Sequence, residues 1–309
     1  MQDRSKTYLC AVLALYLMCA TAEAKTQVQK PAPAAIAPQP PSHLWTKRIA
    51  IRHAWGHQDE KCLAPITNYT TVELFVSPDY RPGRMFPFLD LIGHRFIQDL
   101  YAANVGIGGR YVPDAKASFC QMIGVNAFYD TREGCIGHYR QFGIGFELLG
   151  SKWDFRANAY LPWGQTQHIR TCLFNSYTNN YFLLRKNIES VSYSMNAEGG
   201  YFLINAPQFS LYAACGPYFL SRCCCNTFGF EARIKPQFRD YLALDLSYRY
   251  DDLFGVVLQA ALSLTFPLYQ LSHRTRDPPC RLRNWQIYQP IERFEIIPLQ
   301  LRCCWQKNY

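Results

Sequence analysis

The stretch QFGIGFELLGSKWDFRANAYLP, residues 141–162, decides the fold. Apolar residues occupy every second position from Phe142 to Leu148, and glycine or polar residues stand between them. After Gly150 the alternation resumes, with apolar residues at every second position from Trp153 to Leu161. Successive side chains of a strand point to opposite faces. The stretch therefore predicts a hairpin of two strands, each with one apolar and one polar face.

The length of these segments indicates a membrane rather than a soluble protein. They run for about nine to eleven residues, as a tilted transmembrane strand does, whereas strands of soluble proteins average about five or six. Hydrocarbon offers the backbone no hydrogen-bond partner, so spanning strands must close into a barrel. We therefore predict an all-β fold, a transmembrane antiparallel β-barrel. The alternative is a soluble sandwich, whose polar face would point at water.

The same pattern continues outward in both directions and predicts about 12 strands between residues 45 and 267. An even number is usual for bacterial barrels. Long connections near 55–69, 130–138 and 163–189 alternate with tight turns. With the N-terminus on the periplasmic side, the long connections become extracellular loops. The predicted strands are 46–54, 70–78, 85–95, 102–112, 120–129, 139–149, 152–162, 190–203, 208–219, 226–236, 240–250 and 255–266.

The N-terminus resembles an export signal. Arg4 and Lys6 precede an apolar run at 8–20, and Ala22-Glu23-Ala24 provides a small-x-small cleavage site. We expect residues 1–24 to be a cleaved signal peptide that directs the protein to the outer membrane of a Gram-negative bacterium. A lipoprotein signal through Cys19 is the alternative, which the large residue before that cysteine disfavours. Residues 25–44 contain PAPAAIAPQPPS and form an extended proline-rich linker.

Composition excludes other classes of protein. Charged residues make up 18% of the chain, and mean hydropathy is −0.17. After the N-terminus no run of about 18 apolar residues remains, which excludes a helical span. The net charge is +9, but the basic residues form no tract, so we expect no nucleic-acid partner.

Three consecutive motifs carry a family resemblance: NVGIGGRYV (104–112), GVNAFYD (124–130) and the stretch 141–162. In this order they resemble the β-domain of inverse autotransporters, the intimin/invasin type. The segment IYQPIERFEIIPL (287–299) is similar to the linker that follows the barrel in that family. The resemblance covers about residues 45–300 and implies a barrel whose linker returns through the pore to a passenger. This chain ends at Tyr309, so we expect it to lack a passenger domain.

The C-terminal segment, residues 268–309, is long enough to thread the barrel. An extended chain covers about 3.3 Å per residue, so a layer of about 30 Å takes ten or so residues. We hypothesise that Trp285–Leu299 plugs the pore and that Glu292 and Arg293 pair with charged residues in the lumen. The expected partners are Glu147, Arg156, Glu231, Arg233 and Arg249. The alternative is a tail that lies on the periplasmic underside. The lumen-facing candidates are Glu147, Asp154, Arg156, Glu231, Arg233, Asp245 and Arg249.

The chain contains 13 cysteines, an unusual number for an outer-membrane barrel. Three adjacent cysteines do not suit one metal ion, and the exported compartment favours disulfides. We expect disulfides that staple loops or cross-link neighbouring cysteine-rich envelope proteins; the alternative is that the cysteines are small buried apolar residues. The disulfide candidates are Cys62, Cys135, Cys172, Cys223, Cys224, Cys225, Cys303 and Cys304.

No motif indicates catalysis. The sequence has no H-E-x-x-H, no G-x-S-x-G and no complete glycine-rich phosphate loop, so we expect no catalytic residues, no cofactor and no metal. The leading interpretation is surface anchoring and adhesion through extracellular loops. The alternatives are a porin-like channel for small solutes and a disulfide-cross-linked structural envelope protein. Expected partners are outer-membrane lipid, the barrel-assembly machinery, and a host-cell surface or neighbouring envelope proteins.

Overall fold

A computed structural model describes residues 46–58, 68–79, 83–97, 99–113, 122–178, 181–206, 208–222, 225–268 and 284–308. The chain divides into two units, Met1–Pro41 and Ser42–Tyr309, and the described residues all belong to the second. The expected signal peptide (1–24) and linker (25–44) lie outside the described residues, as do Cys62, Cys223 and Cys224.

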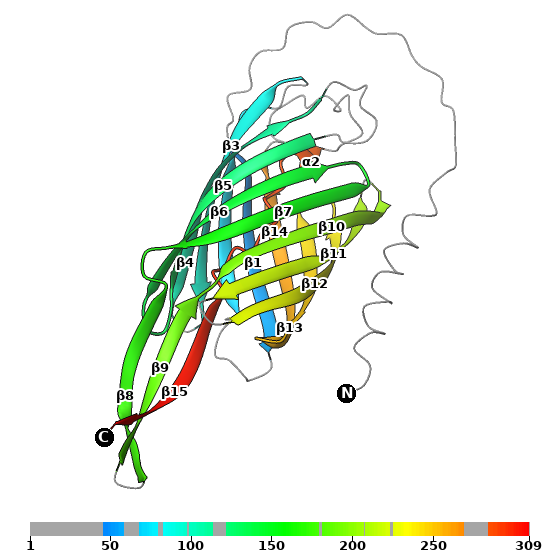
Figure 1. The fold of residues 1–309 in the computed structure, drawn as a ribbon. Helices are drawn as coiled ribbons and strands as arrows, with labels where there is room; N and C mark the ends of the chain where they lie inside the picture. Colours follow the sequence, from blue (N-terminus) through cyan, green and yellow to red (C-terminus); the bar gives the residue numbers. More distant parts are fainter. Residues whose placement is uncertain are drawn as a thin grey trace, which may run out of the picture. The chain divides into compact units, whose positions relative to one another are not determined.

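Twelve antiparallel strands close into a barrel, in the order β1-β14-β13-β12-β11-β10-β7-β6-β5-β4-β3-β2 (Figure 1). This confirms the predicted all-β barrel and its number of strands. Each strand pairs with its neighbours in sequence, except that β7 pairs with β10 and β14 pairs with β1 to close the cylinder. The strands are β1 (Thr46–Gln58), β2 (Tyr69–Val76), β3 (Met85–Phe96), β4 (Tyr101–Tyr111), β5 (Met122–Glu133), β6 (His138–Leu149), β7 (Trp153–Trp163), β10 (Tyr193–Asn205), β11 (Phe209–Arg222), β12 (Cys225–Phe238), β13 (Leu242–Asp251) and β14 (Gly255–Pro267).

The two faces of the barrel wall are inverted relative to a soluble protein. On β6 and β7, Ile144 is 56% exposed and Phe155 is 43% exposed, whereas Glu147 and Arg156 are 2% and 3% exposed. The register sets Glu147 opposite Arg156, so the polar faces of the two strands meet on the same side. The alternation thus directs apolar side chains outward and charged side chains into the lumen, the arrangement that a lipid environment favours.

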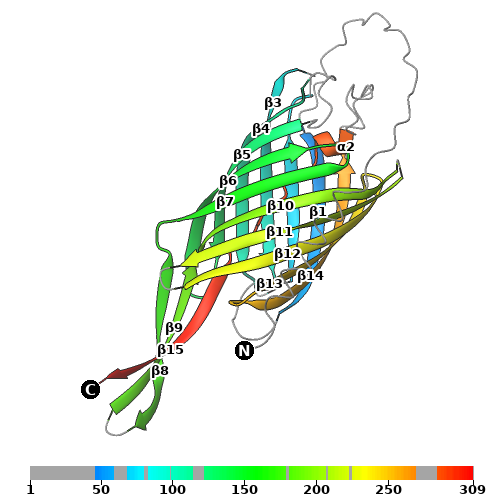
Figure 2. The ribbon, with the colours of Figure 1, turned by 45° about the vertical axis from the view of Figure 1, so that its right-hand side comes forward.

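A three-stranded sheet, absent from the predicted topology, extends beyond one end of the barrel (Figures 1 and 2). It consists of β8 (Gln167–Thr178), β9 (Tyr181–Val191) and β15 (Leu299–Asn308), with β9 in the centre. The prediction of a long connection near 163–189 between two barrel strands is confirmed, because β7 and β10 are neighbours, but the connection is a hairpin of two strands rather than an irregular loop. Register shifts between Thr171 and Phe174 and between Phe174 and Ser176 interrupt the period-two pattern of β8, which explains why its sequence did not indicate a strand.

Residues 284–308 of the C-terminal segment cross the barrel from end to end. The short helix α2 (Asn284–Ile287) lies at the end opposite the three-stranded sheet, and β15 pairs with β9 beyond the other end (Figure 2). Residues 288–298 connect the two elements without regular secondary structure. In the part of the chain that the structure describes, no helix has the length and hydropathy to cross a membrane.

We predict that Ile144→Arg destabilises the barrel by about 2–4 kcal/mol, because Ile144 is central in β6 and its side chain points outward toward hydrocarbon. Urea titration of the protein in phospholipid vesicles measures this free energy of unfolding.

The matched control is Ile169→Arg. Ile169 is 55% exposed, but it lies on β8, in the sheet beyond the barrel. This variant should unfold like the parent protein. Equal effects of the two substitutions would contradict a lipid-facing barrel wall.

Candidate functional site in the barrel lumen

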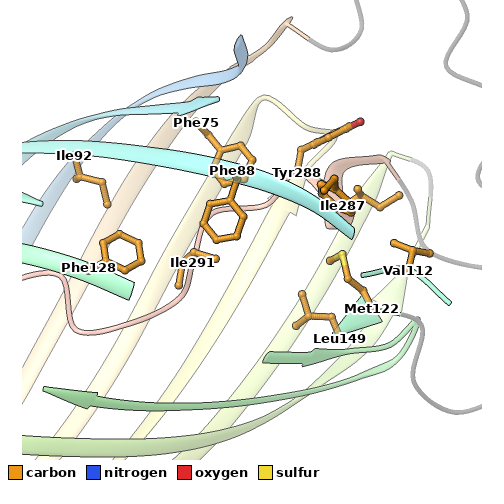
Figure 3. Close-up of a cluster of buried hydrophobic side chains, with 11 residues drawn as sticks. Phe75, Phe88, Ile92, Val112, Met122, Phe128, Leu149, Ile287, Tyr288 and Ile291 are labelled. Carbon is orange, nitrogen blue, oxygen red and sulfur yellow. The ribbon is translucent and has the colours of Figure 1, made fainter. Parts of the chain in front are cut away.

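The lumen contains residues 286–300, which we call the inner segment. Hydrophobic contacts attach the beginning of this segment to the barrel wall. Ile287, Tyr288 and Ile291 are almost fully buried in a cluster formed with side chains of the barrel wall (Figure 3). The wall residues come from β2 to β6 and the turns beside them. They are Phe75, Phe86, Phe88, Ile92, Val112, Met122, Phe128 and Leu149.

Arg110 ties the backbone of the inner segment to the same wall. Its Nη1 donates hydrogen bonds to the carbonyl oxygens of Ile287 and Gln289, both at 2.8 Å. Its Nε donates to the Glu147 carboxylate at 3.1 Å, and both side chains are buried. The guanidinium thus has a charge partner in the wall and also satisfies two carbonyl groups that have no strand to pair with.

Glu292 crosses to the opposite wall. Its carboxylate lies 2.7 Å from Arg233 Nη1 and 2.6 Å from Lys235 Nζ, both on β12. Arg233 also contacts Glu198 of β10 at 2.7 Å and Asp245 of β13 at 3.6 Å. Glu292 therefore joins the inner segment to an alternating network of charges on β10, β12 and β13.

Arg293 turns the other way and pairs with Asp130 of β5 through both of its terminal nitrogens. Asp130 is fully buried, and it also accepts hydrogen bonds from Asn104 at 2.7 Å and Gln141 at 3.1 Å. The guanidinium lies 4.1 Å from the centre of the Phe128 ring. A Cβ on Gly143 would come within 3.1 Å of Arg293, so glycine at that position leaves space for this side chain.

The residues of the inner segment that follow Arg293 also bond to the barrel wall, on the way to β15. Phe294 stacks on Tyr160 at 5.7 Å, and its backbone N–H donates to the Tyr160 hydroxyl at 2.7 Å. Glu295 pairs with Arg52, and Arg132 donates to the carbonyl oxygen of Ile297. The inner segment is therefore bonded to the wall at successive levels rather than at one point.

A second hydrophobic cluster lies where the inner segment leaves the barrel. Ile297 and Leu299 are buried with Tyr139 of β6 and Val191 of β9. Next to this cluster, the Glu189 carboxylate accepts hydrogen bonds from the backbone N–H of Cys135 (3.0 Å) and of Ile136 (2.9 Å). These contacts fix the three-stranded sheet to the connection between β5 and β6.

The residues predicted to face the lumen are placed as follows. Asp154 and Arg156 pair with each other at 2.9 Å. Glu231 pairs with Arg249 at 3.2 Å. Of the predicted set, only Arg233 forms an ion pair with Glu292, and Arg293 pairs with none of them. The segment thus contacts different lumen charges from most of those that we expected.

Several residues of the site were not among the predicted candidates. Each of three residues forms an ion pair in the lumen: Arg110, Asp130 and Glu198. Asp130 and Arg110 lie in the motifs GVNAFYD and NVGIGGRYV, on the polar face of their strands. Extending the alternation through those two motifs would have found them, but which pairs they form depends on the register across the lumen.

Among the described side chains, Cys135 and Cys215 are free thiols. Cys135 is exposed in the connection between β5 and β6; partial burial and the nearby Glu189 carboxylate raise the pKa of its thiol. For Cys172, Cys225, Cys303 and Cys304 the structure describes the backbone alone. No cluster of three or more metal-binding side chains occurs among the residues that the structure describes.

A closed antiparallel barrel with an apolar outer face and a charged lumen defines the class: a transmembrane β-barrel of the outer-membrane kind. A model of the family "Inverse autotransporter, beta-domain" matches residues 78–189. That stretch contains the motifs 104–112, 124–130 and 141–162, so the match confirms the resemblance that they indicated. No curated protein sequence matches the chain.

Several solved structures are similar to this chain. A structure from a study of the in-meso crystallization of membrane proteins is 12% identical, with a TM-score of 0.56 over 83% of this chain and 100% of that chain. The β-domain of the Bordetella autotransporter BrkA is 12% identical, with a TM-score of 0.31 over 72% and 100%. The NanC porin is 10% identical, with a TM-score of 0.38 over 71% and 98%. At such identities the first match establishes a shared fold and nothing finer.

We predict that Arg293→Gln lowers the free energy of unfolding by about 3 kcal/mol, because it removes the charge partner of a buried carboxylate. Urea unfolding in detergent or vesicles gives the value. The double variant Asp130→Asn, Arg293→Gln should regain part of the loss, since no buried charge is then left unpaired.

The control is Arg95→Gln. Arg95 and Asp99 form an ion pair in which both side chains are mostly exposed, so its loss should leave stability unchanged. If Arg95→Gln lowers the free energy of unfolding as much as Arg293→Gln does, burial of the Arg293–Asp130 pair does not increase its contribution to stability.

Proposed function

We propose that this protein is a surface-anchoring barrel that is plugged by its own inner segment and makes adhesion-type contacts at its outer end. The observation that carries the proposal is the path of residues 286–300 through the lumen. They are held by apolar clusters at both ends and by Glu292, Arg293 and Glu295 between them. An arrangement with so many contacts favours a permanent occupant of the lumen over a tail beneath the barrel.

The proposal places β8, β9 and β15 outside the cell. An N-terminus on the periplasmic side puts α2 at the periplasmic end and the three-stranded sheet at the extracellular end. The sheet then replaces the predicted loop 163–189 as the leading contact surface. The partners in this proposal are outer-membrane lipid, the barrel-assembly machinery, and the surface of a host cell or a neighbouring cell. The exported location is part of the proposal and is supported by the signal peptide that the sequence predicts at residues 1–24.

Experiments can distinguish two other functions from the proposed one. A porin-like channel for small solutes requires an open lumen, which the contacts of the inner segment disfavour. A structural envelope protein joined by disulfides requires exposed thiols, and Cys135 is exposed. Non-reducing electrophoresis of whole envelopes distinguishes this last function, because cross-linking would produce species larger than the monomer.

We expect deletion of residues 270–309 to open the pore. Without the inner segment, the charged lumen has no occupant and fills with water. Single-channel recordings in planar bilayers should show little conductance for the full chain and large, stable openings for the truncated one. The matched control deletes residues 301–309, which removes most of β15 and keeps the inner segment; it should stay closed. A truncated barrel as closed as the full chain would contradict the plug.

Adhesion is tested separately, on cells that display the protein. Removal of residues 170–186 deletes the outer part of the β8–β9 hairpin and keeps Glu189 and Val191, which contact the barrel. We expect this variant to reach the surface in normal amounts and to lose binding to host cells. Binding equal to that of the parent protein would exclude the hairpin as the contact surface.

A further inference from the structure

The inner segment does not fill the lumen evenly. Two cavities, of about 140 Å³ and 60 Å³, remain between it and the wall. Strands β1 and β12–β14 contribute to the lining of both, and β2, β5, β7 and β10 also line the larger one. Tyr69, Arg249 and Gln259 line the larger one, toward the three-stranded sheet. Thr265 and Tyr288 line the smaller one, toward α2. The cavities therefore follow one another along the same wall, from one end of the barrel toward the other.

The two cavities share part of their lining. Arg52, Asp245, Ala261 and Glu292 line both of them. The Glu292 carboxylate contacts Arg233, which lines the larger cavity, and Lys235, which lines the smaller one. The side chain of Glu292 thus lies across the boundary between two spaces that both have polar walls.

We propose that the lumen contains a latent path for small inorganic anions along this wall, and that the Glu292 carboxylate closes it. The proposal rests on the function proposed above, in which the inner segment plugs the barrel. Arg and Lys side chains outnumber Asp and Glu among the residues that line the two cavities. Without Glu292, Arg233 keeps its contacts with Glu198 and Asp245, but Lys235 loses the carboxylate at 2.6 Å. Removal of Glu292 therefore adds net positive charge where the two linings overlap, and this charge attracts anions.

The opposite wall keeps the inner segment in place when Glu292 is shortened. Arg110 still binds the carbonyl groups of Ile287 and Gln289, and Arg293 still pairs with Asp130. The wall partners in these contacts, Arg110 on β4 and Asp130 on β5, do not line either cavity. Loss of the Glu292 side chain therefore widens the boundary without releasing the segment.

The test is Glu292→Ala in the full chain, recorded in planar bilayers with potassium chloride. We expect a conductance several-fold above that of the parent protein and well below that of the barrel lacking residues 270–309. In a salt gradient, the reversal potential should show selectivity for chloride over potassium. A conductance as large as that of the truncated barrel would mean that the segment has left the lumen, and would overturn the proposal.

A second substitution distinguishes conduction along the proposed path from conduction through a generally loosened inner segment. Ala261→Phe adds a large side chain where the two linings overlap, so Glu292→Ala combined with Ala261→Phe should be closed again. If the double variant conducts like Glu292→Ala alone, or if Glu292→Ala stays closed, the path does not exist. A closed Glu292→Ala together with an open truncated barrel would reject this inference alone, whereas a closed truncated barrel would reject the plug itself.

Discussion

The fold depends on one constraint: hydrocarbon offers no partner to a backbone N–H or C=O group. Each strand of the barrel must therefore pair on both edges, and β1 must meet β14. The side chains then divide between two solvents. Apolar residues such as Ile144 face lipid, and charged residues such as Arg156 are sequestered inside. Charged side chains therefore accumulate in the lumen. A segment that occupies the lumen must offer these buried charges partners of opposite sign or hydrogen bonds.

The inner segment meets this requirement with a different chemistry on each side. Toward β2–β6 it presents Ile287, Tyr288 and Ile291 to an apolar cluster, which excludes water. Toward β12 it presents Glu292 to Arg233 and Lys235. Removing one partner of such a partly buried ion pair destabilises the protein, because the remaining charge stays desolvated without a partner. The segment is therefore specified by complementarity to both walls rather than by hydrophobicity alone.

The sequence was sufficient for the barrel because a period of two residues is repeated in every strand, as in Phe142–Leu148. It was less informative about the site. Alternation identifies which side chains share a face, but the partner of Arg293 depends on where the segment turns inside the lumen, and Asp130 was not expected. The three-stranded sheet was missed for two physical reasons. The shifts near Phe174 break the period of β8, and β15 pairs with β9 across more than a hundred residues of intervening chain.

The ladder between β15 and β9 has a mechanical consequence. It runs from Leu299 opposite Val191 to Asn308 opposite Phe182, along the axis on which β15 leaves the barrel. Tension applied to the outer end of β15 would load these hydrogen bonds in shear, so that many must break together, instead of peeling them one after another. The sheet is therefore built to resist a pull along β15 better than a pull across it.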